Sequence, residues 1–315
     1  MHPSAESHHL PSTMYVRPFS WDDLPRWTVL YNTAFGLATT EGEFDEPEMR
    51  LHLSIPGLAP ERDCFIARES GADAGLAVLW PELPIRRAVL QMGVSGGRSP
   101  QAVEQALLDA AIERASRLPV DLLHTQIPSE DDAGRRLLCD AGFLPVRQYA
   151  TLRWSGDALP KEDLPHDFAL RSFRIGHDTK ALTDIQNAAF TDSWGFSPNT
   201  VEQIEARVAS KSTTPEGILF VTHGDDVAAY NWTVRPAGPG GKLGRIAMTG
   251  VHPNYRGMGL SRPTVLAGMR WLASQGVEVI ELEMDSSNLS AAKVYQSLGF
   301  EKVSDTVWYE LRLGD

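Results

Sequence analysis

Apolar residues in the second half of the chain recur with two periods, and each period predicts a different element. From Glu278 to Met284 they alternate with glutamates, which is typical of a strand with one buried face. From Leu289 to Leu298 they recur at helical spacing, and Gly299 then supplies the positive φ that ends many helices. The same pattern predicts strands near residues 168–174, 217–222, 226–234, 243–251, 278–284 and 303–313, and helices near 179–190, 201–210, 260–275 and 289–298.

The first half of the chain repeats this order of elements after roughly 155 residues, as internal repeats of one fold do. Three short echoes keep nearly the same offset, namely 16–19 with 170–173, 32–35 with 187–190, and 141–143 with 298–300. A length of 315 residues accommodates two domains. We therefore expect an α/β protein with two tandem domains, built on a mixed, mostly antiparallel sheet with helices on both faces. The expected divisions are a disordered tail over 1–12, a first domain over 13–155, a linker over 156–166 and a second domain over 167–315.

Composition and charge argue against several classes of function. The chain has 29 basic and 41 acidic residues and a net charge of −12, whereas a nucleic-acid partner requires a basic face. No apolar run is long enough to span a bilayer and the polar start has no signal-peptide core, so we expect a cytoplasmic protein with no membrane partner. The two cysteines and nine histidines show no metal-ligand spacing, so no metal is expected. The acidic balance is compatible with a cationic amine substrate.

A glycine-containing turn between a predicted strand and a predicted helix is the strongest chemical signal. Gly257 and Gly259 let the backbone approach a ligand without a Cβ in the way, and Arg256 adds a fixed positive charge. The helix that follows presents free N–H groups and the positive end of its dipole. Neither GxxxxGK[ST] nor GxGxxG is present at this turn. The pattern predicts a pyrophosphate-binding turn, with an ordinary glycine turn as the alternative.

Two motifs of the chain resemble those of the GNAT superfamily of acyl-CoA N-acyltransferases, and they occur in the order found in that superfamily. Arg256 and Gly259 match its Arg/Gln-x-x-Gly-x-Gly/Ala turn, whereas Ser261 departs from the last position. The run 288–300 matches its N-x-x-A-x-x-x-Y-x-x-x-G-F signature. The resemblance implies the fold of that superfamily, N-acetyltransferase activity and acetyl-CoA as the co-substrate.

The same resemblance implies which residues hold acetyl-CoA. The backbone of the strand before the turn would pair with the pantetheine arm, at Thr249, Gly250 and Val251. The pyrophosphate would lie on Arg256, Gly257, Met258, Gly259, Leu260 and Ser261. Asn288 would contact the cofactor near the pantetheine or position the helix that follows it.

Amide formation from a thioester requires that the acceptor ammonium lose a proton and that the leaving thiolate gain one. The resemblance makes Tyr295 the acid, because a phenol is still protonated at neutral pH. Glu283, twelve residues earlier, occupies the position of the base in the superfamily's ribosomal-protein Nα-acetyltransferases. Glu281 is a substitute on the same face of the strand. A core tyrosine and an exposed strand glutamate are the alternatives for these two positions.

The first half keeps the predicted order of strands and helices but has different side chains at the positions that carry the chemistry of the second half. If Arg98 corresponds to Arg256, Gln101 replaces the second glycine of the turn. Counting back from Phe143 puts Gln126, Asp131 and Leu138 at the positions of the glutamate, the asparagine and the tyrosine. The second glycine, the glutamate, the asparagine and the tyrosine of the second half are thus replaced. We therefore expect a degenerate first domain that supports or walls the site.

The acceptor side is less defined. Asp192 could meet an ammonium, and Trp194 and Trp232 could offer cation–π faces, with core packing as the alternative for both tryptophans. The expected acceptor is a primary amine of a small molecule or a peptide, and the expected protein is a monomer or a homodimer. Two rival hypotheses are a non-catalytic acyl-CoA-binding sensor or partner-binding module, and an enzyme for a longer acyl-CoA.

Overall fold

The computed structural model describes residues 14–35, 43–96, 99–156, 158–161, 164–235 and 241–314. The N-terminal half contains β1 (Met14–Pro18), η1 (Trp21–Asp23), α1 (Leu24–Phe35), α2 (Glu46–Leu53), α3 (Pro60–Asp63), β2 (Cys64–Glu69), β3 (Ala72–Glu82), η2 (Leu83–Ile85), β4 (Arg87–Val94), α4 (Pro100–Ala115), β5 (Leu122–Pro128), α5 (Asp132–Asp140) and β6 (Leu144–Trp154). The C-terminal half contains β7 (Ala169–Ser172), α6 (Thr179–Phe190), α7 (Val201–Val208), β8 (Thr213–His223), β9 (Asp226–Val234), β10 (Leu243–Val251), η3 (Pro253–Tyr255), α8 (Ser261–Ser274), β11 (Val279–Asp285), α9 (Leu289–Ser297) and β12 (Glu301–Arg312). The tail expected over 1–12 lies outside the described residues.

The helices and strands predicted for the C-terminal half are confirmed, with small differences at their ends. The largest difference is at β8, which begins at Thr213 rather than near residue 217. Thr213 pairs with Val234 at the end of β9, across a register shift that precedes Ile218. Such a shift interrupts the alternation of apolar and polar residues, so the sequence pattern did not reveal the first residues of the strand.

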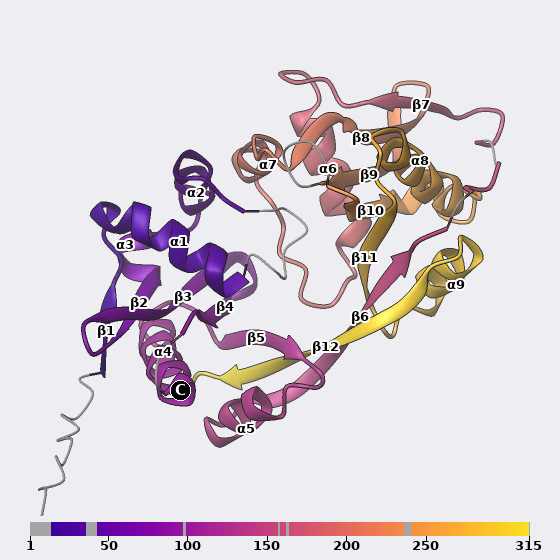
Figure 1. The fold of residues 1–315 in the computed structure, drawn as a ribbon. Coiled ribbons are helices and arrows are strands. Elements are labelled where there is room, and N and C mark those ends of the chain that lie inside the picture. Colours follow the sequence, from indigo (N-terminus) through magenta and orange to yellow (C-terminus); the bar gives the residue numbers. More distant parts are fainter. Residues whose placement is uncertain are drawn as a thin grey trace, which may run out of the picture.

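One sheet of twelve strands runs through the described residues, in the order β1-β2-β3-β4-β5-β12-β6-β11-β10-β9-β8-β7 (Figure 1). The neighbouring strands are antiparallel except for β4 with β5 and β10 with β11. The sheet is therefore mixed and mostly antiparallel, as expected from the sequence. Figure 1 shows the two halves as separate lobes that a narrow band of strands connects.

That band arises because the halves exchange their last strands. β6 pairs with β11 of the C-terminal half, and β12 pairs with β5 of the N-terminal half. β6 and β12 also pair with each other. The sequence repeat does not predict this exchange. The alternation of apolar and polar residues in β6 and β12 is the same whether each strand pairs within its own half or with the other half.

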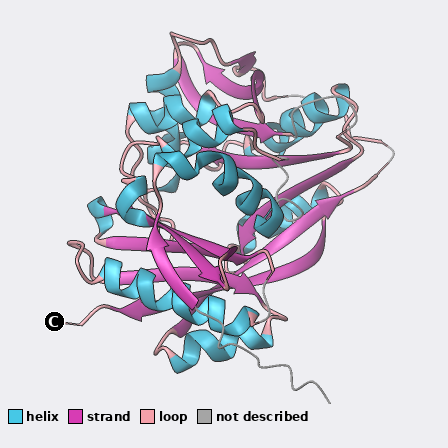
Figure 2. Ribbon diagram, turned by 60° about the vertical axis from the view of Figure 1, so that its left-hand side comes forward, coloured by secondary structure: helices cyan, strands magenta, loops and turns pink. Residues whose placement is uncertain are grey.

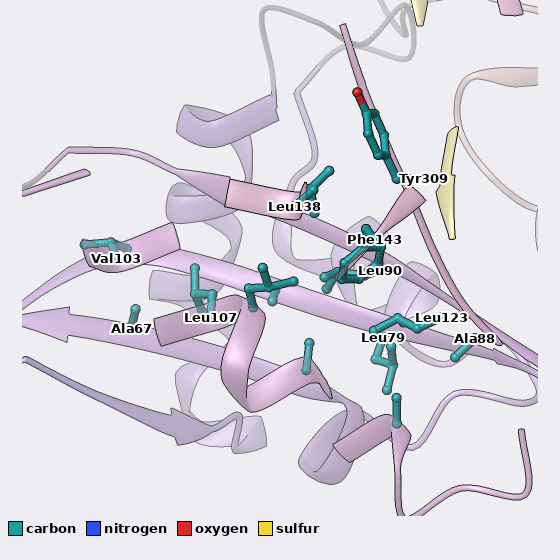
Figure 3. Packing of buried hydrophobic residues seen from close by; sticks show 14 of the residues in the cluster. Ala67, Leu79, Ala88, Leu90, Val103, Leu107, Leu123, Leu138, Phe143 and Tyr309 are labelled. Carbon is teal, nitrogen blue, oxygen red and sulfur yellow. The ribbon is translucent and has the colours of Figure 1, made fainter. Parts of the chain in front are cut away.

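Helices cover both faces of the sheet in each half (Figure 2). In the N-terminal half, α4 and α5 cover a cluster that includes Leu79, Leu107 and Phe143 (Figure 3), and α1 and α2 cover another with Trp27 and Met49. In the C-terminal half, α8 and α9 cover one face, and α6 and α7 cover the other. Burial of these apolar side chains is the main stabilising contribution. None of the described helices is both long and apolar enough to cross a membrane.

Candidate active site

A gap opens between two neighbouring strands of the C-terminal half. Residues 243–245 of β10 pair in parallel with 279–281 of β11. Beyond them β10 pairs with β9, across a register shift between Ile246 and Met248, while β11 pairs with β6. Within the described residues, the facing edges of β10 and β11 therefore carry backbone groups without a strand partner. Such groups require another hydrogen-bonding partner.

The residues predicted to bind pantetheine lie on this free edge of β10. Gly250 has no room for a side chain, because a Cβ there would lie 2.7 Å from the Cβ of Ala189 on α6. The Thr249 hydroxyl donates to the carbonyl of Tyr230 at 3.0 Å, so its side chain is tied to β9. His252 donates its backbone N–H to the carbonyl of Ala228 at 2.9 Å, so His252 and Gly250 turn their backbone groups toward β9. The backbone groups of Thr249 and Val251 therefore point toward the gap. Their role in cofactor binding stays a prediction.

The predicted pyrophosphate turn is open, and both of its glycines have a positive φ. Gly257 and Gly259 have φ angles of +81° and +76°, and a Cβ at either would meet no atom within 4 Å. Met258, between them, is exposed. The glycines are needed here for their conformation, because other residues rarely adopt a positive φ.

The helix that follows the turn leaves its N-terminus available. α8 begins at Ser261, and no side chain caps it. Leu260 precedes it with a buried side chain, so only the backbone of Leu260 can contact a ligand. Uncapped N–H groups at the positive end of a helix dipole suit an anion. These residues therefore fit the diphosphate of an acyl-CoA.

Arg256 links the turn to the end of α6. Its guanidinium donates to the carbonyl of Ala189 at 3.0 Å and lies 3.7 Å from the carboxylate of Asp192. Asp192 was predicted to bind the acceptor, but in this structure it is an exposed neighbour of the predicted pyrophosphate turn. An ion pair between exposed groups contributes little stability, so a bound diphosphate can compete for Arg256.

Three carboxylates project from one face of β11, and each forms an ion pair with an arginine. The pairs are Arg153–Glu281 at 2.6 Å, Arg245–Glu283 at 2.9 Å and Arg147–Asp285 at 2.7 Å. Two of the arginines come from the exchanged strand β6, whereas Arg245 comes from β10 at the point where the gap begins. Glu283, the predicted base, keeps 35% of its side chain exposed. Glu281, its predicted substitute, keeps 14%.

Tyr295, the predicted acid, lies on α9 beneath the opposite face of β11. It belongs to the same hydrophobic cluster as Ile246 of β10 and Leu282 of β11. Burial raises the pKa of Tyr295 to about 12, so the phenol is protonated at neutral pH. Because Leu282 and Glu283 are consecutive in a strand, their side chains point to opposite faces. Glu283 and Tyr295 therefore lie on opposite sides of the sheet at β11.

Asn288 positions the helix that carries Tyr295. Its side-chain oxygen accepts from the backbone N–H of Ala291 at 3.1 Å and from the hydroxyl of Ser290 at 2.9 Å. This is an N-cap, which satisfies one of the free donors in the first turn of α9. Of the two roles predicted for Asn288, the structure thus supplies a physical basis for the positioning role.

A cavity of about 850 Å³ lies between the two halves. The N-terminal half contributes side chains from α2, β3 and β4, and the C-terminal half contributes side chains from α6, α7 and β9. Ala247 and Met248 of β10 line its wall at the register shift, so the cavity reaches the strand that borders the gap. Beside the cavity, Gln203 of α7 donates to the carbonyl of Pro56 at 3.0 Å, which links the two halves.

The two tryptophans predicted to bind the acceptor occupy different places. Trp232 lines the cavity but is 4% exposed, and its indole donates to the hydroxyl of Thr213 at 3.2 Å. Trp194 reaches the N-terminal half, where it stacks on His124 at 5.3 Å between ring centroids. It also meets the edge of Trp308 at 5.8 Å. Trp194 therefore connects the halves beside the cavity.

The N-terminal half keeps the outline of this site with different side chains. Residues 87–90 of β4 pair with 122–125 of β5, and the strands then separate as β10 and β11 do. Asp131 accepts from the backbone N–H of Gly134 at 2.9 Å and caps α5, as Asn288 caps α9. Leu138 is fully buried on α5. Arg98 lies outside the described residues.

Three features of the C-terminal half fit an anionic ligand with an extended arm. The gap beside β10, the open glycine turn and the uncapped start of α8 follow one another along the chain. Among the described residues, no three His, Cys, Asp or Glu side chains gather in a way that could hold a metal ion.

Sequence reasoning missed several residues that border the site. The sequence predicted only a strand at Arg245, and it placed Arg147 and Tyr149 in the degenerate first domain, away from the catalytic one. Their positions depend on the strand exchange, which no local pattern signals. The carboxylates that alternate along β11 were the one signal in the sequence for these arginines, because like charges on one face of a strand repel each other unless cations lie between them.

The chain is similar to known proteins in both sequence and fold. The Acetyltransferase (GNAT) family profile matches residues 179–300. A mycothiol acetyltransferase from Paenarthrobacter aurescens is 31% identical over 262 residues, which cover 82% of this chain and 80% of that protein. A tandem GNAT protein from the clavulanic acid biosynthesis pathway superposes with a TM-score of 0.73 at 17% identity, over 96% of this chain and 99% of that one. A GCN5-related N-acetyltransferase from Sphaerobacter thermophilus gives a TM-score of 0.71 at 18% identity, over 96% of each chain.

The separating strands, the glycine turn and these matches together define an acyltransferase. The chain belongs to the GNAT acetyltransferase family, and it is an N-acyltransferase with the tandem GNAT fold. The family, fold class and enzyme class predicted from the sequence are therefore confirmed.

Proposed function

We propose that the protein is an acetyl-CoA-dependent N-acetyltransferase that moves an acetyl group to a primary amine of a small molecule or peptide. In this proposal the amine attacks directly, with Glu283 as the base and Tyr295 as the acid, and catalysis takes place in the C-terminal half. The observation that carries the proposal is the gap between β10 and β11, which has Glu283 on one face and Tyr295 on the other.

Acetyl-CoA supplies an activated acetyl group as a thioester. Its pantetheine arm would pair with the free backbone groups of Thr249 and Val251 and lie beside Gly250. Its diphosphate would lie on the turn 256–261 and the N-terminus of α8. A backbone N–H of β10 would polarise the thioester carbonyl, in the manner of an oxyanion hole.

Glu283 would accept the proton that the acceptor ammonium must lose, either directly or through one water. Its partial exposure lets an amine or a water reach it. The ion pair with Arg245 holds its carboxylate at the start of the gap. Arg245 is in this account a positioning residue, because it fixes the direction of the base without touching the substrate.

As the C–N bond forms and the C–S bond breaks, the nitrogen would lose its second proton to solvent, and the thiolate would leave and be protonated by solvent. During this step Tyr295 would donate a hydrogen bond to the sulfur. Its pKa of about 12 lies above that of an ordinary thiol, near 8.5, so complete proton transfer from the phenol is unfavourable. The hydrogen bond is therefore the larger contribution of Tyr295. It strengthens as negative charge develops on sulfur, which is the condition for lowering a barrier.

The cavity between the halves would hold the acceptor. It borders β10 beside the gap and has aromatic and polar walls, including Trp80, Trp232 and Arg87. The N-terminal half would be degenerate for catalysis and would act as one wall of this cavity. Because the relative from Paenarthrobacter aurescens is a mycothiol acetyltransferase, an amine related to mycothiol is the first acceptor to test.

The proposal is tested by acetyl transfer to a panel of amines, namely kanamycin, glucosamine, L-cysteine and the dipeptide Ala-Ala together with a mycothiol-related amine. CoA release and the mass of the acetylated product are measured. Glu283→Gln should lower kcat by about 10²- to 10⁴-fold, the usual contribution of a general base. Glu281→Gln is the matched control on the same face and should leave kcat within a few-fold.

Three outcomes distinguish the hypotheses. A large loss in Glu281→Gln with none in Glu283→Gln would transfer the role of base to Glu281. Transfer only from a longer acyl-CoA would contradict the acetyl specificity. Tight acetyl-CoA binding without transfer to any amine would favour a non-catalytic acyl-CoA-binding module.

A further inference from the structure

The strand exchange brings residues of the N-terminal half next to the proposed base. Along the antiparallel pair of β6 and β11, Thr151 lies opposite Glu283, and Tyr149 lies opposite Asp285. Side chains alternate along a strand, and residues opposite each other share a face. Tyr149 and Thr151 therefore project from the face of the sheet that carries Glu283.

Tyr149 connects this face to the wall of the cavity. The centroid of its ring lies 6.3 Å from that of Trp308 and 6.5 Å from that of Trp194. Trp308 lines the cavity. The charged groups that act on the Tyr149 phenol are Asp285, Arg147, Arg87 and Glu283. The ring of Tyr149 therefore lies beside a residue that lines the cavity, on the face of the sheet that carries Glu283.

The hydroxyl of Tyr149 is available to a ligand. Within the described part of the chain it forms no hydrogen bond, and it is not among the polar atoms that are sealed from solvent without a partner. Burial and the nearby Asp285 raise the pKa of Tyr149, so at neutral pH it is a neutral phenol that both donates and accepts. A half-buried polar group next to a reaction site gains most from a partner that arrives with the substrate.

We propose that Tyr149 is an acceptor-binding residue supplied by the N-terminal half. Its hydroxyl hydrogen-bonds the amine-bearing end of the acceptor as that end leaves the cavity and meets Glu283. The inference rests on the proposed function and deepens it, because it assigns part of the acceptor site to the half that lacks the catalytic side chains. The ligand class is a primary amine whose nitrogen, or a polar group beside it, forms a hydrogen bond with a phenol.

The test is the variant Tyr149→Phe, assayed with the amine of the panel that the wild type acetylates fastest. Loss of one hydrogen bond to the acceptor should raise its KM about tenfold and leave kcat within about twofold. The dissociation constant for acetyl-CoA should not change. Phenylalanine keeps the ring contacts with Trp194 and Trp308, and the melting temperature checks that the fold is kept.

Tyr309→Phe is the matched control. Tyr309 is a tyrosine of the other exchanged strand, β12, but it packs in the core of the N-terminal half beneath α4 and α5. Loss of its hydroxyl should change neither KM nor kcat. A general effect of loosening the exchanged strands would appear in both variants.

The outcomes separate this inference from the proposed function. If the wild type acetylates an amine and Tyr149→Phe keeps the KM of the wild type, the inference is wrong and the proposed function stands. An equal rise of KM in Tyr149→Phe and Tyr309→Phe would also overturn the inference. If the wild type acetylates no amine, the proposed function fails and the inference fails with it.

Discussion

Tyr295→Phe tests the acid side of the proposed chemistry. The substitution removes one oxygen and keeps the ring in its hydrophobic cluster, where only 8% of the residue is exposed. If Tyr295 only fills the core, loss of the hydroxyl leaves turnover unchanged. If Tyr295 contacts the leaving sulfur, the transition state loses a hydrogen bond to a charged group.

The expected loss follows from the pKa of about 12. Because full proton transfer from such a phenol to a thiolate is unfavourable, the contribution is that of a hydrogen bond to a charged group, about 1.5–3 kcal/mol. Each 1.36 kcal/mol is tenfold in rate, so kcat should fall about 10- to 150-fold. Complete transfer of the proton would instead predict a loss of up to about 10⁴-fold.

The assay is steady-state release of CoA with the amine and acetyl-CoA each varied, and calorimetry for the acetyl-CoA dissociation constant. The account expects a lower kcat with an unchanged dissociation constant, and Tyr309→Phe again serves as a control. A kcat within twofold of the wild type would remove Tyr295 from the mechanism and leave it as a core tyrosine.

The same variant predicts a pH dependence of stability. Burial raises the pKa of the folded phenol to about 12, whereas an unfolded tyrosine titrates near 10. The contribution to stability is complete below pH 10 and is lost as the pH rises toward 12, because the unfolded chain ionises first. Between pH 9 and 11 the wild type should lose about 1.4 kcal/mol of unfolding free energy relative to Tyr295→Phe. Urea unfolding measures this difference, and parallel curves for the two proteins would show that the phenol is not buried.

Two further variants test the elements that position the site. Asn288→Ala should lower the unfolding free energy by about 1 kcal/mol and reduce kcat, because α9 loses its N-cap, while Asn288→Asp keeps the cap and should keep stability. Equal stability of the alanine and aspartate variants in urea unfolding would contradict the capping role. Burial opposes ionisation of Asp178, but hydrogen bonds from Arg174 and Arg171 outweigh it and hold its pKa well below its usual range. Asp178→Asn should therefore cost about 2 kcal/mol at pH 7, and the difference should shrink as the pH falls below 4, because the carboxyl of the unfolded chain is then protonated while that of the folded chain is still ionised. A cost that persists undiminished at low pH would mean that the ion pairs are not its source.

Much of the C-terminal half follows from local patterns. The alternation at 278–284 and the helical spacing at 289–298 reflect burial of one face, and such periods are local properties of the sequence. The turn at Gly257 and Gly259 was also predicted from its place between a strand pattern and a helix pattern. The positive φ of both glycines is a finding of the structure, and it explains why glycine occupies these positions.

The remaining features depend on contacts between residues far apart in the chain. The exchange of β6 and β12 cannot be read from alternation, since β5 and β11 accept either strand. The ion pair of Arg245 with Glu283 follows from the parallel register of β10 and β11, which sequence spacing does not fix. Trp194 stacks on His124 of the other half, a partner that sequence spacing does not indicate. In each case the partner is set by the tertiary fold rather than by the residue itself.

The most direct test of the central claim is a calorimetric titration with acetyl-CoA. The account predicts one site per chain, which Gly259→Glu abolishes through its bulk and its like charge against the diphosphate. Gly96→Glu is a control of the same charge and size before α4 of the N-terminal half, where a Cβ also meets no atom within 4 Å, and it should leave binding intact. Two sites per chain, or undiminished binding in Gly259→Glu, would contradict the assignment of the active site to the C-terminal half.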